Sequence, residues 1–167
     1  MPSEPFPFER EVEQERLAYG RVLPEAVQAM QALERVVDAG GLEPLLRELV
    51  KIRASQLNGC AYCLDMHTKD ARAAGETEQR LYVLPAWRET DFYTPRERAA
   101  LAWAEAVTRL ANQEVSDAVY DEARQHFDEK ALVDLTLAVI AINGWNRLAI
   151  PFRSKVGSYR PATHAAR

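Results

Sequence analysis

Apolar residues recur at intervals of three and four along most of the chain, the spacing that places them on one face of an α-helix. The first run begins at Pro24, a favourable first helical residue, and stops at Gly40 and Gly41. A second run covers residues 42–58 and stops at Gly59. Its six apolar positions form one stripe: Leu42, Leu45, Leu46, Leu49, Ile52 and Leu57. Each run predicts a helix that packs through a single face.

Turn residues delimit the next elements. A third helix is predicted for residues 60–74, followed by Gly75 as a left-handed C-cap. A shorter helix is predicted for residues 77–84 and ends at Pro85, which cannot continue it. Residues 86–93 are expected to form a loop.

Capping signals open the remaining helices. Thr94, Pro95 and Glu97 combine a capping box with proline at the first helical position. Two further helices have N-cap residues of their own, and are predicted for residues 117–127 after Ser116 and for residues 129–145 after Asp128. The last of these is apolar nearly all round in its middle and is therefore expected at the centre of the core.

The pattern of the whole chain predicts an all-α fold. No run of useful length alternates between apolar and polar residues as a half-buried strand does, and no internal repeat is present. We expect about seven helices. Residues 1–20 are assigned to an N-terminal arm and its approach, residues 21–152 to the helical domain and residues 153–167 to a C-terminal tail.

Composition and charge exclude several classes of partner. The 167 residues are 47% hydrophobic, which suits one domain with a sizeable core. The net charge is −4 and basic residues are scattered among carboxylates, so neither nucleic acid nor an anionic membrane is an expected partner. The most apolar run, residues 131–142, is shorter than the roughly 20 residues that cross a bilayer. It is predicted to be a buried core helix.

The N-terminal residues carry neither the basic nor the apolar region of a secretory signal, so a cytoplasmic location is expected. Thiols stay reduced in the cytoplasm, where a close cysteine pair is more often catalytic or metal-binding than structural. The two cysteines, Cys60 and Cys63, are only three positions apart. A bridge between them would close a tiny loop and add little stability. Their value is therefore expected to lie in reactivity or ligation.

The spacing of Cys60, Cys63 and His67 places all three side chains on one face of the third predicted helix. Cys60 lies at or just before the N-terminus of that helix. The positive end of the helix dipole and the unpaired amides there favour a thiolate and lower its pKa. His67 could accept a proton from Cys63 or take part in a proton relay, because imidazole exchanges protons near neutral pH.

Glu48 lies on the preceding helix, at the edge of its apolar stripe. A partly desolvated carboxylate at that place would suit a role in orienting His67 or in transferring a proton. An exposed Glu48 paired with Lys51 is the alternative, and position alone does not decide between the two.

Two other readings of the cysteine pair stay open. Cys60, Cys63, His67 and Glu48 could together bind zinc as a structural module, although no second CxxC or paired histidine lies nearby. The pair could also act as a thiol–disulfide adaptor or redox sensor with little peroxide turnover of its own. A thioredoxin-type centre is disfavoured because no βαβ pattern surrounds the motif.

A longer motif carries a family resemblance. The chain has the pattern E-x4-R-x-S-x4-C-x-Y-C-x3-H, formed by Glu48, Arg53, Ser55, Cys60, Tyr62, Cys63 and His67. This pattern, together with the block 141–147, resembles the alkyl hydroperoxidase D (AhpD)-like branch of the carboxymuconolactone decarboxylase superfamily. The resemblance extends over about residues 34–152. It implies an all-helical fold that forms homo-oligomers, commonly trimers or hexamers.

The resemblance also implies a peroxidase activity without a cofactor. Cys63 would be the peroxidatic thiol, and Cys60 would protonate the leaving group and then resolve the sulfenic acid to a disulfide. Glu48 and His67 would form the proton relay. A peroxide is the implied substrate, and an external dithiol or protein reductant the implied partner. Tyr62 departs from the pattern of the characterised adaptor enzyme, which has a histidine immediately before its second cysteine.

Overall fold

The computed structural model describes residues 14–161, and the predicted N-terminal arm falls largely in residues 1–13, outside the described part. Residues 162–167 of the predicted tail also lie outside it. Residues 14–161 form eight α-helices and one 3₁₀ helix, without a strand: α1 (Tyr19–Val22), α2 (Pro24–Ala39), α3 (Pro44–Asn58), α4 (Ala61–Ala73), α5 (Glu78–Val83), η1 (Leu84–Glu89), α6 (Pro95–Thr108), α7 (Asp117–His126) and α8 (Glu129–Phe152). The all-α prediction is confirmed.

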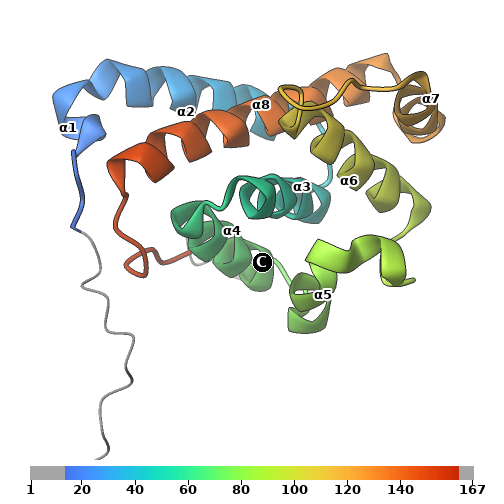
Figure 1. Ribbon diagram of the computed structural model, residues 1–167, viewed down its shortest axis with the longest axis horizontal. Coiled ribbons are helices and arrows are strands. Elements are labelled where there is room, and N and C mark those ends of the chain that lie inside the picture. The colour runs from blue at the N-terminus through green and yellow to red at the C-terminus, as the bar shows by residue number, and fades with distance from the viewer. Residues whose placement is uncertain (1–13, 162–167) are drawn as a thin grey trace, which may run out of the picture.

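Helix α3 lies at the centre of the molecule (Figure 1) and contacts α4, α6 and α8. Helices α2 and α8 run side by side along one edge, and α4 lies on the opposite side of α3. This order follows from the apolar stripe of α3, because Leu46, Leu49, Val50 and Ile52 are all buried. Each of them removes a large apolar surface from water when the neighbouring helices pack.

The predicted capping signals are confirmed at several helix starts. The Thr94 side chain accepts a hydrogen bond from the Glu97 backbone amide, and the Glu97 carboxylate accepts one from the Thr94 backbone amide. Together they form a complete capping box. Ser116 and Asp128 cap α7 and α8 through their side chains. Gly75 has a φ of 101°, the left-handed conformation expected of it.

The structure corrects the predicted helix boundaries at three places. Helix α8 was expected to end at residue 145 but continues to Phe152, because Pro151 stands in the last turn and removes only one late backbone bond. Part of the expected loop 86–93 belongs to the 3₁₀ helix η1, whose first turn contains Pro85. The four-residue helix α1 is too short for periodicity to reveal.

Helix α8 is by length and composition alone apolar enough to cross a membrane. The core helix of a folded domain meets the same criteria, and α8 contacts α2, α3 and α6. Nine of its residues are buried, which agrees with the predicted core position: Leu132, Asp134, Leu135, Ala138, Val139, Ala141, Ile142, Asn146 and Ala149.

Candidate functional site

The junction between α3 and α4 places Cys60 at the start of a helix. Gly59 ends α3 in the left-handed conformation at a φ of 70°, which glycine adopts at little cost. The chain then turns so that the Cys60 amide donates to the Ser55 carbonyl at 3.0 Å. Cys60 is therefore the N-cap residue of α4, with an extended backbone. The prediction that it lies at or just before a helix N-terminus is confirmed.

The two thiols face each other across the first turn of α4. Their sulfur atoms lie 2.6 Å apart, and the Cys63 amide donates to Cys60 Sγ at 3.3 Å. Both cysteines are free thiols, and the residues are only 1% and 0% exposed. Ala54, Ile142 and Ala149 pack around them. The pair is thus shielded from bulk water.

The two thiols differ in acidity because they share one proton. A hydrogen bond from the Cys63 side chain lowers the pKa of Cys60 to about 7, against the opposing effect of burial. The same hydrogen bond, together with burial, raises the pKa of Cys63. The N-cap position explains this order, since Cys60 faces the unpaired amides of the helix start and Cys63 does not. The negative charge of the pair therefore resides on Cys60.

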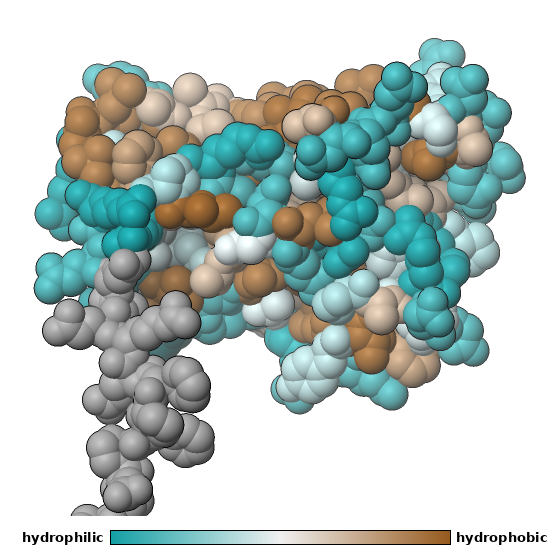
Figure 2. Space-filling view, in the orientation of Figure 1, coloured by the Kyte–Doolittle hydropathy of each residue, from teal (hydrophilic) through white to brown (hydrophobic). Residues whose placement is uncertain are grey.

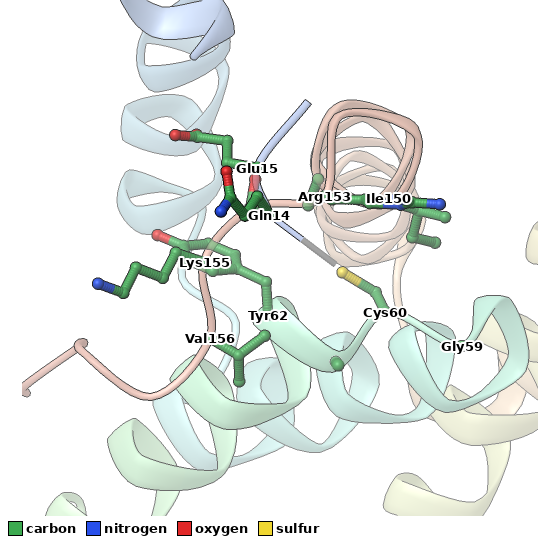
Figure 3. Close-up of a pocket in the computed structure, with 12 residues that line it drawn as sticks. Gln14, Glu15, Gly59, Cys60, Tyr62, Ile150, Arg153, Lys155 and Val156 are labelled. Carbon is green, nitrogen blue, oxygen red and sulfur yellow. The ribbon is translucent and has the colours of Figure 1, made fainter. Parts of the chain in front are cut away.

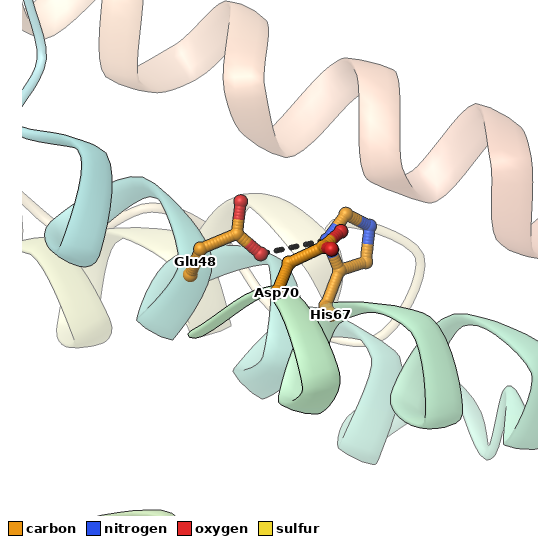
Figure 4. Close-up of side chains that lie close together, drawn as sticks. All are labelled: Glu48, His67 and Asp70. Carbon is orange, nitrogen blue, oxygen red and sulfur yellow. Dashed lines mark hydrogen bonds and ion pairs between the residues drawn. The ribbon is translucent and has the colours of Figure 1, made fainter. Parts of the chain in front are cut away.

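Glu48 and His67 form the second half of the site. Glu48 Oε2 lies 2.8 Å from His67 Nδ1, and the side chains are 14% and 6% exposed. The alternative pairing of Glu48 with Lys51 is wrong, because the Lys51 ammonium is buried against Glu34 at 2.5 Å. His67 Nε2 is buried and has no hydrogen-bond partner among the described residues. Figure 4 shows this nitrogen on the side of the ring away from Glu48.

Asp70 and Tyr159 adjoin that pair, and the sequence analysis did not assign them to the site. One carboxylate oxygen of Asp70 lies within 4.8 Å of ligand atoms of both Glu48 and His67. The Tyr159 hydroxyl donates to the two Asp70 oxygens at 2.8 and 3.0 Å. Burial, and then the hydrogen bond to Asp70, raise the pKa of Tyr159 to about 12, so this hydroxyl stays protonated. The segment that follows α8 is thereby attached to α4 beside the Glu48–His67 pair.

The zinc site considered as an alternative is not assembled. In the described part of the chain, the group of side chains close enough to share a metal ion consists of Glu48, His67 and Asp70. Neither Cys60 nor Cys63 belongs to it. The four ligands that a structural zinc site would have required are therefore not brought together.

A cavity of about 670 Å³ opens beside Cys60. It lies between the start of α4, the end of α8 and the segment that follows α8 (Figure 3). Tyr62 forms part of its wall, together with Ile150 and Val156, and Cys63 does not line it. Cys60 therefore lines the cavity, and Cys63 lies directly behind it, 2.6 Å from the Cys60 sulfur.

Asn146 of α8 is a further polar residue beside the thiols. It is 0% exposed, and its amide favours the ionised form of each thiol, although the hydrogen bond to Cys60 and burial keep the pKa of Cys63 raised. Its neighbours one turn away on α8, Ile142 and Ala149, pack against the same thiols. The sequence signal available was an amide on the face of an otherwise apolar helix, which periodicity alone does not connect to a residue on α4.

The other two polar residues of the motif, Arg53 and Ser55, make hydrogen bonds that hold helices together. Arg53 donates to Glu105 Oε1 at 2.7 Å, and both residues are buried. Ser55 is 0% exposed and accepts a hydrogen bond from Asn146 at 3.2 Å. Arg53 therefore links α3 to α6, while Ser55 contacts the side chains next to the thiols.

Comparison with known proteins identifies the family of the chain. The model of the carboxymuconolactone decarboxylase family matches residues 24–106. The uncharacterised protein YdfG of Bacillus subtilis is 45% identical over 144 residues, which are 86% of this chain and 98% of YdfG.

Two solved structures share the fold. ATU0492 of Agrobacterium tumefaciens, a protein of unknown function described as an AhpD antioxidant defence candidate, is 42% identical with a TM-score of 0.84. The match covers 87% of this chain and all of ATU0492. A peroxidase-related AhpD core from Ralstonia eutropha is 22% identical with a TM-score of 0.74, over 84% and 75% of the two chains, and supports the fold alone. The chain therefore belongs to the carboxymuconolactone decarboxylase family and has an AhpD-like helical fold.

Proposed function

We propose that this protein is a thiol-dependent peroxidase that reduces hydroperoxides at the Cys60–Cys63 pair. The observation that carries the proposal is the pair itself, two free thiols with sulfur atoms 2.6 Å apart. Such a pair can pass from thiols to a disulfide with little movement of the chain. The description of ATU0492 as an AhpD antioxidant defence candidate supports the same activity.

In the first step Cys63 attacks the terminal oxygen of the hydroperoxide. An S–O bond forms as the O–O bond breaks, so the sulfur is oxidised to a sulfenic acid and the peroxide is reduced. The Cys63 proton passes to the Cys60 thiolate across the 2.6 Å contact. Cys60 then delivers this proton to the leaving alkoxide, which departs as an alcohol.

In the second step Cys60 resolves the sulfenic acid. Its thiolate attacks the Cys63 sulfur, an S–S bond forms, and the S–O bond breaks. The departing hydroxide takes a proton from the Glu48–His67 relay and leaves as water. An external dithiol then reduces the disulfide through a mixed disulfide, and Cys60 is its point of attack because Cys60 lines the cavity. This requirement for a reductant favours a reducing compartment such as the cytoplasm.

Mass spectrometry after one equivalent of hydroperoxide tests the proposal. The wild-type protein is expected to form the Cys60–Cys63 disulfide, and Cys60→Ser is expected to accumulate an oxidised acid on Cys63. If the wild-type thiols stay free, the peroxidase proposal fails. An oxidised acid on Cys60 in Cys63→Ser, with none on Cys63 in Cys60→Ser, would exchange the two roles.

A thiol–disulfide adaptor or redox sensor uses the same residues at a different rate. The exposure of Cys60 to the cavity, with Cys63 behind it, also suits exchange with a partner dithiol. A steady-state assay with several dithiol donors separates the two functions. Peroxide turnover with at least one donor supports the peroxidase, whereas disulfide exchange without turnover supports the adaptor.

We also propose that the protein forms a homo-oligomer through the edge made by α2 and α8. Figure 2 shows apolar side chains gathered along this edge. Val36, Val133 and Ile140 are 53%, 59% and 48% exposed there. Light scattering is expected to give a trimer or hexamer, and Ile140→Glu is expected to dissociate it. A monomeric wild-type protein would contradict this proposal.

A further inference from the structure

A chain of amide side chains crosses from α3 and α6 to α8 next to the thiols. Asn58 Nδ2 donates to Asn143 Oδ1 at 2.9 Å and to Asn146 Oδ1 at 2.8 Å. Asn143 Nδ2 donates to the Val139 carbonyl at 2.9 Å and to Thr108 at 3.0 Å. Amides can be turned by 180° without a change of shape, so their orientation has to follow from the partners they have.

Two groups with a single hydrogen-bonding role orient Asn143. The Val139 carbonyl can only accept, and therefore requires the amide nitrogen of Asn143 to face it. The Arg147 guanidinium can only donate, and lies 2.9 Å from Asn143 Oδ1. Both conditions hold in one orientation of Asn143 and fail in the other.

The orientation of Asn143 determines that of the next two amides. Because Asn143 presents its oxygen to Asn58, Asn58 must present its nitrogen to both Asn143 and Asn146. Asn146 must then present its oxygen to Asn58, and the nitrogen of the Asn146 amide therefore faces Ser55. One N–H of that nitrogen donates to Ser55 Oγ at 3.2 Å. The second N–H remains for the thiols.

We infer that Asn146 is a catalytic residue whose second N–H donates to the sulfur atoms of the Cys60–Cys63 pair. Asn146 is 0% exposed and stands between Ile142 and Ala149 on the face of α8 that covers both cysteines. A fixed donor at this place stabilises negative charge on sulfur without any rearrangement during the reaction. Asn146 adds to the lowering of the Cys60 pKa, after the hydrogen bond from Cys63, and partly offsets the raised pKa of Cys63, which agrees with this assignment.

The contribution of Asn146 to peroxide turnover rests on the proposed function. Its effect on the thiol pKa does not, because a hydrogen-bond donor stabilises a thiolate whatever the substrate is. Arg147, Asn143 and Asn58 are positioning residues in this arrangement. They keep the Asn146 oxygen away from the sulfur atoms, where a lone pair would oppose the thiolate.

The test is to titrate the thiols of the wild type, Asn146→Ala and Asn146→Asp. The titration is monitored through the rate of alkylation with iodoacetamide between pH 5 and 10. Asn146→Ala removes the donor, and Asn146→Asp replaces it with a carboxylate of the same shape. Both are expected to raise the lower thiol pKa by about one unit or more, with Asn146→Asp the larger effect, so that alkylation at pH 6 slows by about tenfold. Rescue of the wild-type titration by Asn146→Gln is not expected, because the longer side chain displaces the amide.

Thr136→Val is the matched control, because Thr136 is another polar residue of α8 that bonds Trp103 at 3.0 Å and does not belong to the amide chain. It is expected to lower thermal stability and leave the thiol titration unchanged. Should the Asn146 variants not fold, Asn58→Ala frees Asn146 to turn, and is expected to raise the same pKa. A wild-type titration in folded Asn146→Ala or Asn58→Ala overturns the inference. A shifted titration without any peroxide turnover would retain the inference and reject the peroxidase.

Discussion

Two buried polar centres adjoin α3, and they differ in how completely their hydrogen bonds are satisfied. In the first, Glu105 accepts from Arg53 and Trp87 at one oxygen, at 2.7 and 2.8 Å, and from Arg88 at the other, at 2.7 Å. Although burial opposes ionisation, the hydrogen bonds from Trp87, Arg88 and Arg53 keep the pKa of Glu105 below its usual value. Every oxygen of this carboxylate has a donor.

The second centre, formed by the thiol pair and His67, contains polar groups whose hydrogen bonds are not all satisfied. The thiols share one proton, His67 Nε2 lacks a partner within residues 14–161, and a cavity of about 670 Å³ reaches Cys60. Buried polar groups without a partner lower stability and are rare in folded proteins. The comparison teaches that the motif contains two kinds of residue. Arg53 holds helices together, whereas Cys60, Cys63, His67 and Glu48 form the centre that we propose to be reactive.

Cys63→Ser is expected to have the largest effect on activity with little effect on stability. Serine keeps the shape of the side chain but is not a nucleophile toward peroxide at neutral pH, so turnover should fall to the uncatalysed rate. The free energy of unfolding should change little, which denaturant titration checks. Measurable turnover in this variant would mean that Cys63 is not needed for the reaction.

The opposite pattern is expected from Glu105→Ala. Removing this carboxylate leaves the buried Arg53 without its ion pair, and breaking such a pair costs about 3–5 kcal/mol of stability. Chemical denaturation measures the loss in the free energy of unfolding. The thiol titration should stay as in the wild type. The control is Glu43→Ala, which removes a more exposed pair with Arg96 and is expected to cost about 1 kcal/mol or less. Equal losses in the two variants would contradict the distinction.

His67→Asn tests the relay within the second centre. The asparagine amide can replace His67 Nδ1 as the donor to Glu48, but it supplies no titratable nitrogen in place of Nε2. Loss of general acid–base transfer is expected to reduce turnover by on the order of 10²-fold, with the first oxidation of Cys63 less affected than disulfide formation. Stopped-flow measurement of the two steps checks this order. A uniform loss in both steps would indicate a structural role for His67.

The pH dependence of stability should carry the signature of the thiol pair. Because the folded pKa of Cys60, about 7, lies below its ordinary value of 9.0, the unfolded chain binds more protons between these values and stability rises with pH across that interval. The contribution is lost as the pH falls through about 7, and is on the order of 2 kcal/mol. Above pH 9 stability should fall again, since the raised pKa of Cys63 keeps its proton in the folded state. The difference between wild type and Cys60→Ser in denaturation from pH 6 to 10 measures it, and a flat difference would contradict it.

The smallest effect is expected from Tyr159→Phe, which removes one hydroxyl from Asp70. The lost hydrogen bond should cost about 1 kcal/mol and loosen the segment after α8, which hydrogen exchange at residues 154–160 would report. Lys69 also holds this segment, through the Tyr159 carbonyl at 3.3 Å, so the segment should stay attached. Full release of the segment in this variant would show that the Tyr159–Asp70 bond is its main anchor.

The sequence predicted the parts of the molecule that depend on local rules. Helical spacing located α2 and α3, and the cap residues Thr94, Ser116 and Asp128 located three helix starts. Motif spacing correctly placed Cys60 and Cys63 at the start of one helix, where their sulfur atoms lie 2.6 Å apart, with His67 further along the same helix. The continuation of α8 from residue 145 to Phe152 was not predicted.

The remainder of the site depends on contacts between distant segments. Asn146 meets Ser55 across 91 positions, and Tyr159 meets Asp70 across 89. No periodicity relates residues so far apart, and only the packing of α8 and its tail on α3 and α4 creates these pairs. The Glu48–His67 bond is intermediate, because the two helices are consecutive and the apolar stripe of α3 placed Glu48 at its edge without deciding between His67 and Lys51 as its partner.

The titration of the thiol pair in the reduced wild-type protein tests the central claim most directly. Thiolate absorbance, combined with mapping of the alkylated residue, gives both the pKa and the cysteine that holds the charge. We expect a midpoint near 7 and alkylation at Cys60. Titration of both cysteines near the ordinary value of 9.0 would contradict the claim that the junction of α3 and α4 holds an activated thiol pair.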